Sequence, residues 1–240
     1  RVKLRFVQTR LLCQIQSNMP AAASSSETVV MLHGLARTPR SMLAAGLWFK
    51  KAGYRVAYVS YPSRKIGVAA AVRDFVAPEL EKIAASPGVE KLHFVTHSLG
   101  GIVFRAWAAL HAEKVPVGRA VLLAPPNNGS EIADKVGDWS VAKKIMGPVL
   151  QELRTDEDAT PKRLGPVKVE TGVIMGDEAN LPFFRQWLDG ASDGVVTVEG
   201  GRIGGLKDFL VLPAGHTWIM WRPKVLDAAV HFVREGCFPR

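Results

Sequence analysis

The hydrophobic pattern alternates between short β-branched runs and longer segments with helical spacing. The β-branched runs predict six strands, at residues 28–32, 55–59, 91–95, 119–123, within 167–175, and 208–212. The helical spacing predicts helices at residues 41–51, 66–85 (with Pro78 kinking or restarting the helix), 99–112 and 224–235. This alternation predicts an α/β fold with a mostly parallel six-stranded sheet and helices on both faces.

One segment is too long for a simple crossover. More than forty residues, 125–166, separate the fourth and fifth predicted strands. Apolar residues recur within it near helical spacing, interrupted by Gly147-Pro148. The pattern fits a helix packed on the sheet and also a cap over a site, and the two interpretations are compatible. We therefore expect one domain over residues 27–240 with a helical, cap-like insertion at about 125–166.

The charge of the chain is positive but carries no nucleic-acid signature. The net charge is +9, and residues 1–26 contribute four of the bases and no acid. No DNA- or RNA-binding motif accompanies them, so we interpret the excess as a solvated basic surface. Weak association with an anionic membrane surface stays open. The segment 1–26 is expected to be mobile and to add nothing to the chemistry.

The cysteines and the apolar runs bear on location. Cys13 and Cys237 lie at opposite ends of the chain and could pair only if the first segment docked beside the last helix. We interpret them as free thiols, which favours a reducing, cytoplasmic setting. No apolar run approaches the roughly 20 residues that span a bilayer. The run at residues 11–13 is cut off by Gln14, so no signal peptide is predicted.

The candidate nucleophile lies between the third strand and its helix, in Thr96-His97-Ser98-Leu99-Gly100. A serine at such a sharp strand-to-helix turn has a strained backbone and an exposed hydroxyl, the arrangement of the pattern Gly-x-Ser-x-Gly. Thr96 replaces the first glycine and crowds the approach of the helix to the strand. Gly100 and Gly101 can relieve that crowding.

The other components of an acyl-transfer site follow in order along the chain. His216 comes directly after the sixth strand and is the candidate base, and Asp193, after the fifth strand, is the candidate acid. Asp177 is nearer the end of the fifth strand and is the alternative acid. We favour Asp193 because its loop is long enough to reach back, and the order Ser…Asp…His is that of a known hydrolase site.

The candidate oxyanion donors are the backbone amides of Leu35 and Leu99. His33-Gly34-Leu35 directly follows the first strand, where glycine lets the backbone turn beneath a substrate carbonyl. His33 is interpreted as structural, and His97 as a residue that lines the pocket or packs locally. No group of histidines, cysteines and acids has metal-ligand spacing, so we predict neither a metal nor a cofactor.

From Glu27 to the C-terminus the chain resembles a bacterial esterase/lipase of the α/β-hydrolase superfamily. The similarity rests on five stretches: Leu32-His33-Gly34-Leu35, Thr96 to Gly101, Asn128-Gly129-Ser130-Glu131-Ile132-Ala133-Asp134, Ser192-Asp193-Gly194-Val195-Val196 and Gly215-His216-Thr217. It implies an α/β-hydrolase fold, Ser98, Asp193 and His216 as the catalytic triad, and Leu35 and Leu99 as oxyanion donors. Trp218 stands where related secreted lipases often have a calcium-binding aspartate, so no calcium requirement is expected.

The expected activity is cofactor-independent hydrolysis of a small-molecule carboxylic ester or lipid through an acyl-enzyme. The same triad could serve a thioesterase, an amidase or an acyltransferase. In a different class, the chain could be a non-catalytic relative that binds a lipid or a partner. The fold hosts many substrates, so the residues alone do not choose among them.

Overall fold

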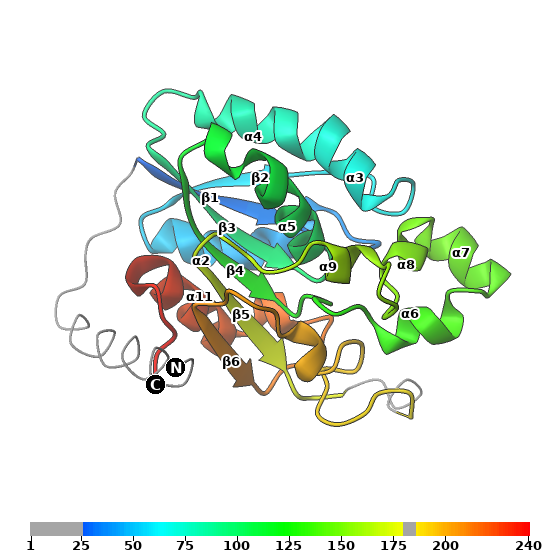
Figure 1. Ribbon diagram of the computed structural model, residues 1–240. Helices are drawn as coiled ribbons and strands as arrows, with labels where there is room; N and C mark the ends of the chain where they lie inside the picture. The colour runs from blue at the N-terminus through cyan, green and yellow to red at the C-terminus, as the bar shows by residue number, and fades with distance from the viewer. Residues whose placement is uncertain (1–25, 180–185) are drawn as a thin grey trace.

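The computed structural model describes residues 26–179 and 186–240, and its centre is a six-stranded sheet (Figure 1). The strands are β1 (Glu27–Leu32), β2 (Arg55–Val59), β3 (Lys91–His97), β4 (Val117–Leu123), β5 (Thr171–Gly176) and β6 (Asp208–Leu212), in the order β2-β1-β3-β4-β5-β6. Every pairing is parallel. The six strands and the parallel sheet predicted from the sequence are therefore confirmed. The prediction for residues 1–25 lies outside the described residues.

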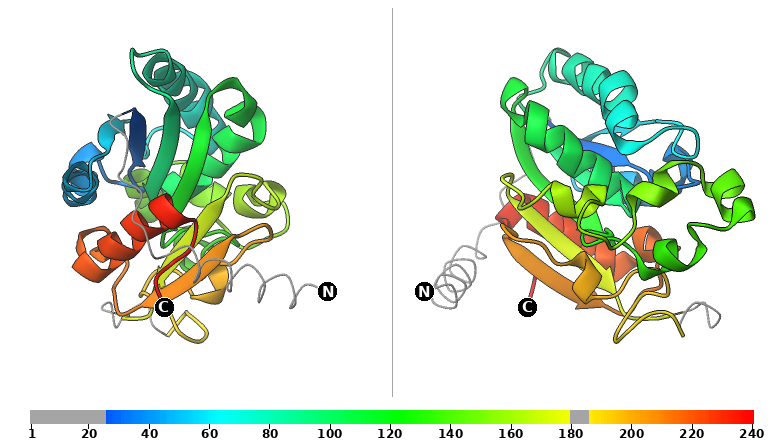
Figure 2. Two further views of the ribbon diagram at one scale, coloured as in Figure 1. Left: turned by 90° about the vertical axis from the view of Figure 1, so that its left-hand side faces the viewer. Right: turned by 45° about the vertical axis from the view of Figure 1, so that its right-hand side comes forward.

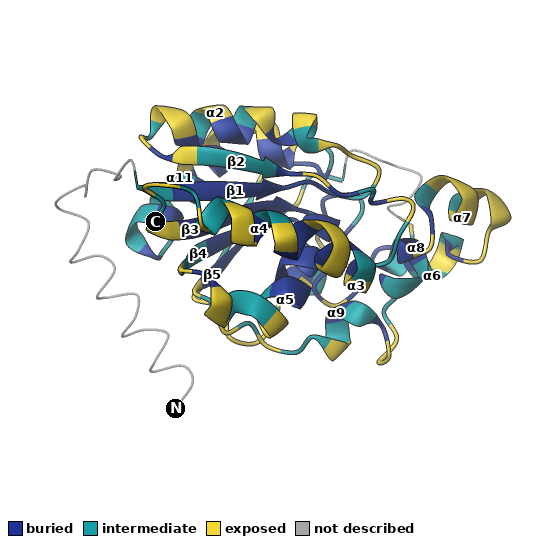
Figure 3. Ribbon diagram, turned by 90° about the horizontal axis from the view of Figure 1, so that it is seen from above, coloured by how far each residue is buried: buried dark blue, intermediate teal, exposed yellow. Residues whose placement is uncertain are grey.

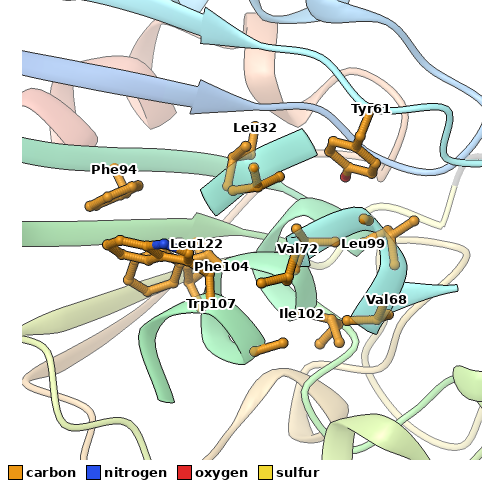
Figure 4. Packing of buried hydrophobic residues seen from close by; sticks show 14 of the residues in the cluster. Leu32, Tyr61, Val68, Val72, Phe94, Leu99, Ile102, Phe104, Trp107 and Leu122 are labelled. Atoms are coloured by element: carbon orange, nitrogen blue, oxygen red, sulfur yellow. The ribbon is translucent and has the colours of Figure 1, made fainter. Parts of the chain in front are cut away.

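Helices cover both faces of the sheet (Figure 2). One face carries α2 (Leu43–Lys51) and α11 (Pro223–Glu235), and the other carries α3 (Val68–Ala71), α4 (Ala77–Ala84) and α5 (Leu99–His111). Because successive strand residues point to opposite faces, each strand contributes to two buried layers. The central strands are buried, whereas the covering helices also have exposed residues (Figure 3). On the α5 side, the ring of Phe94 lies 4.8 Å from that of Phe104 and 5.1 Å from that of Trp107 (Figure 4).

The long helical stretch predicted over residues 66–85 is three segments. A five-residue π-helical segment, Val72–Val76, joins α3 to α4. Pro78 lies in the first turn of α4, where a residue without a backbone N–H is tolerated. The chain is therefore helical without a break from residue 68 to residue 84, and a π-helical turn just before Pro78 takes the place of the expected kink or restart.

The insertion between β4 and β5 contains four short helices, α6 (Glu131–Val136), α7 (Ser140–Met146), α8 (Val149–Glu152) and α9 (Thr160–Arg163). α7 ends at Gly147, whose φ of 79° and close contact with the Arg64 carbonyl admit only glycine. α8 buries Val149 and Leu150 in the core, whereas α7 is exposed and lies furthest out (Figures 1 and 3). The packing interpretation holds for α8, and the role of the segment as a cap stays a prediction.

The free-thiol interpretation is wrong for Cys237. Cys237 is disulfide-bonded, and the described part of the chain contains no free cysteine. The other cysteine of the sequence, Cys13, lies outside the described residues. The expectation of a reducing compartment was based on free thiols, so it no longer has that support. Across residues 26–179 and 186–240, no helix is long and apolar enough to cross a membrane.

A buried arginine ties the insertion to the core. Arg105 of α5 donates to the backbone carbonyl and side-chain oxygen of Asn127, both at 3.1 Å, and to the carbonyls of Pro161 and Gly165, both at 2.8 Å. Within residues 26–179 and 186–240 it has no carboxylate partner, and burial lowers its pKa to about 10. The guanidinium thus joins three segments that are distant in sequence through carbonyl acceptors alone.

We expect Arg105→Ala to lower the free energy of unfolding by about 3 kcal/mol, because it leaves several buried acceptors unpaired. Arg163→Ala, at an exposed position of α9, is the matched control and should change it by less than about 0.5 kcal/mol. Urea denaturation measures both. Equal, small effects would contradict a linking role for Arg105.

Candidate active site

The turn from β3 into α5 holds Ser98 in a conformation that non-glycine residues rarely adopt. Its backbone angles are φ 53° and ψ −123°, and such a residue persists only when its surroundings enforce it. The Ser98 N–H donates to the Leu123 carbonyl on β4 at 2.9 Å, and the Ser98 carbonyl accepts from the Gly101 N–H at 2.9 Å. These bonds fix the serine at the carboxyl edge of the sheet.

Two glycines allow this turn to pack. A Cβ at Gly100 would lie 2.6 Å from the Leu32 carbonyl oxygen, and a Cβ at Gly101 would lie 3.4 Å from Thr96 Oγ1. Gly100 therefore lets α5 approach β1. A Cβ at Gly101 would lie 2.9 Å from Pro125 Cβ, so this glycine makes room for Pro125, and its contact with Thr96 would be an ordinary one. The sharp turn forms with Thr96 in place of the first glycine.

Three sequence-predicted residues come together in one hydrogen-bonded chain. Ser98 Oγ lies 2.9 Å from His216 Nε2, and His216 Nδ1 lies 2.7 Å from Asp193 Oδ2. The His216 backbone N–H also donates to the Asp193 carbonyl at 3.0 Å. A carboxylate accepts only, so Nδ1 carries the proton and Nε2 is free to accept from the serine hydroxyl.

The Asp193 carboxylate is fully buried and firmly oriented. Its Oδ1 accepts the backbone N–H groups of Val195 at 2.9 Å and Val196 at 2.8 Å, leaving Oδ2 for the imidazole. Asp177, by contrast, is exposed and makes no hydrogen bond to His216. Between the two candidate acids, the geometry favours Asp193.

The loop after β1 brings Leu35 beside the serine. Among the described residues, the backbone N–H groups of Leu35 and Leu99 donate to no protein acceptor, so both are available to a ligand. A Cβ at Gly34 would lie 3.1 Å from Ser98 Cβ, which shows how closely this loop approaches the turn. Free backbone donors close to a candidate nucleophile suit a developing oxyanion.

Two residues that hold the Leu35 loop are absent from the sequence-based predictions. The Tyr61 hydroxyl donates to the His33 carbonyl and its ring stacks on the His33 imidazole at 4.4 Å, while Ser63 Oγ accepts from the Ala36 N–H at 3.2 Å. Their position directly after β2 is the feature of the sequence that could have indicated this role. β2 pairs with β1 in parallel, so the residues that follow β2 meet the loop that follows β1.

The stretch Asn128 to Asp134 supports the loop that bears the acid. Ser130 Oγ donates to the Val195 carbonyl at 3.2 Å, and Glu131 accepts from the Thr197 hydroxyl at 3.1 Å. Val195 in turn donates its N–H to Asp193. The stretch therefore acts on the candidate acid through one intervening residue.

The fold is that of the α/β-hydrolases. The chain is similar to the mature Bacillus licheniformis lipase BlEst2, at 19% identity and a TM-score of 0.66, over 85% of this chain and 90% of that one. It is also similar to the metagenomic carboxyl esterase MGS0156, at 17% identity and a TM-score of 0.65, over 92% and 75% of the two chains. The Vlm2 thioesterase domain matches at 12% identity and a TM-score of 0.52, over 92% and 96%. No protein-family model and no curated sequence matches the chain.

Three buried histidines should make stability depend on pH. Desolvation by burial lowers the pKa of His33, that of His97 well below its ordinary value, and that of His93 to about 4. Below about pH 6.5 the unfolded chain therefore binds more protons at these sites than the folded protein does, so stability falls as the pH falls.

We expect the free energy of unfolding, measured in urea, to decrease steadily from pH 7 to pH 5, and His93→Gln to flatten that decrease. A free energy that is constant or rises over this range would show that the folded protein tolerates protonated imidazoles at these positions.

Proposed function

We propose that this protein is a serine hydrolase that cleaves carboxylic esters, with Ser98, His216 and Asp193 as the triad. The observation that carries the proposal is the unbroken chain from Ser98 Oγ through His216 to the buried Asp193, starting at a strained turn. A satisfied core serine needs neither the strain nor an imidazole oriented by a carboxylate.

In the first half of the reaction, Ser98 Oγ attacks the ester carbonyl carbon while His216 Nε2 takes the hydroxyl proton. The C=O π electrons move to the carbonyl oxygen, which the Leu35 and Leu99 N–H groups stabilise. The tetrahedral intermediate collapses as the bond to the alkoxy oxygen breaks. His216 protonates that oxygen, so the alcohol leaves and the acyl group stays on Ser98.

In the second half, water replaces the alcohol. His216 takes a proton from water, the resulting hydroxide attacks the acyl carbon, and the bond to Ser98 Oγ breaks as His216 returns the proton to that oxygen. Asp193 stays ionised throughout. It holds the Nδ1–H tautomer and stabilises the imidazolium that forms twice in each cycle.

The substrate is proposed to be a small-molecule ester or lipid, which accords with the lipase and esterase among the structurally similar proteins. A thioester is the second candidate, because a thioesterase domain shares the fold, and amide hydrolysis and acyl transfer use the same steps with a different leaving group or acceptor. A purely binding relative would have no use for a hydrogen-bonded nucleophile and base.

The proposal is tested with p-nitrophenyl esters of short and long acyl chains. We expect the wild type to turn them over and Ser98→Ala to lose at least about 10³-fold in kcat while keeping its thermal unfolding midpoint. Equal hydrolysis by the folded variant would remove Ser98 from the mechanism. No turnover by the wild type across the series would direct the search to thioester and amide substrates.

The identity of the acid is tested by a matched pair of substitutions. Asp193→Asn should lower kcat by about 10³- to 10⁴-fold, because the amide no longer selects the productive imidazole tautomer or stabilises its cation. Asp177→Asn removes an exposed carboxylate and should leave kcat close to that of the wild type. The opposite ranking would reassign the acid to Asp177.

A further inference from the structure

His97, the residue directly before the candidate nucleophile, makes a contact that the proposed mechanism does not use. Its Nε2 lies 2.9 Å from the backbone carbonyl oxygen of His216, and the two rings lie 5.1 Å apart. The side chain is almost completely buried. A carbonyl only accepts, so Nε2 carries the proton and donates it.

This contact closes a ring of interactions around the base. His216 is held through its own N–H and its Nδ1 by Asp193, through its Nε2 by Ser98, and through its carbonyl by His97. Because His97 and Ser98 are consecutive, one rigid turn contacts both the imidazole and the backbone of His216. The loop that follows β6 is thereby attached to the turn that follows β3.

His97 provides this donor without a charge. Its Nδ1 is buried with no protein partner among the described residues and faces the Cα of Gly34, whose added Cβ would lie 2.8 Å away. Desolvation by burial is the main reason why the pKa of His97 lies well below its ordinary value. Electrostatic interactions with His216, Arg37 and His33 lower this pKa further. A lysine or arginine could donate the same bond, but its charge would oppose the imidazolium on His216.

We propose that His97 is a positioning residue for His216, and that its Nε2–H···O bond fixes the distance between the base and the Ser98 hydroxyl. The catalytic consequence rests on the proposed function, whereas the structural consequence does not. A base displaced by about 1 Å loses on the order of 100-fold in rate. The loss should fall on kcat, because His97 has no proposed contact with substrate.

Three substitutions separate the donor from the shape of the side chain. Glutamine places an N–H at the reach of Nε2, asparagine places one only at the reach of Nδ1, and phenylalanine keeps the ring without a donor. We expect His97→Gln to retain kcat within about fivefold, and His97→Asn and His97→Phe to lose about 10- to 100-fold with KM little changed. Thermal unfolding midpoints identify any variant that fails to fold.

If His97 had only a structural role, all three variants would be less stable than the wild type, and their kcat values would not follow this order. If His97→Phe does not fold, the two polar variants still decide, since equal kcat for His97→Gln and His97→Asn would overturn the proposal.

A second measurement is independent of turnover. The Nδ1 proton between His216 and Asp193 is followed by ¹H–¹⁵N NMR without substrate. It should persist in wild type and His97→Gln, and be lost or broadened in His97→Asn and His97→Phe. An unchanged signal in all four proteins would overturn the positioning role. A normal signal in a wild type that hydrolyses no ester would contradict the proposed function alone.

Discussion

The site depends on the backbone of Ser98, held at φ 53° and ψ −123° where β3 becomes α5. Such a conformation costs about 1–3 kcal/mol in a non-glycine residue and must be compensated by its surroundings. Here the compensation is the buried strand β3 on one side and the close approach of α5 to β1 at Gly100 on the other. The turn cannot relax into the helix, so its hydroxyl stays at the carboxyl edge of the sheet.

The parallel sheet then supplies the remaining parts at the same edge. The loops after β1, β3, β5 and β6 carry Leu35, Ser98, Asp193 and His216, respectively. Each loop is anchored by hydrogen bonds to a neighbour. The first is held by Tyr61 and Ser63, and the Ser98 turn by Leu123. The loop of the candidate acid is held by Ser130, and that of the candidate base by His97. Loops fixed in this way can hold a constellation of side chains to the precision that acyl transfer requires.

Much of this could be predicted from the sequence because the signals are local. Each strand is a β-branched run, and the pattern around Ser98 needs only neighbouring residues to be recognised. The buried bonds of Arg105, the stacking of Tyr61 on His33 and the bond from His97 to His216 join residues 22 to 119 positions apart. No periodicity encodes such contacts. The disulfide bond of Cys237 likewise has no signal in the residues around it, and the free-thiol interpretation was wrong there.

The proposed mechanism requires that His216 activates Ser98 as a nucleophile. A fluorophosphonate reacts covalently with such a serine whatever its natural acyl substrate, and peptide mass spectrometry of the labelled protein locates the adduct. We expect stoichiometric modification of Ser98 in the wild type, with the label absent from Ser98→Ala and much slower to form in His216→Gln. An unmodified Ser98 in the folded protein, or a label formed equally fast without His216, would contradict it.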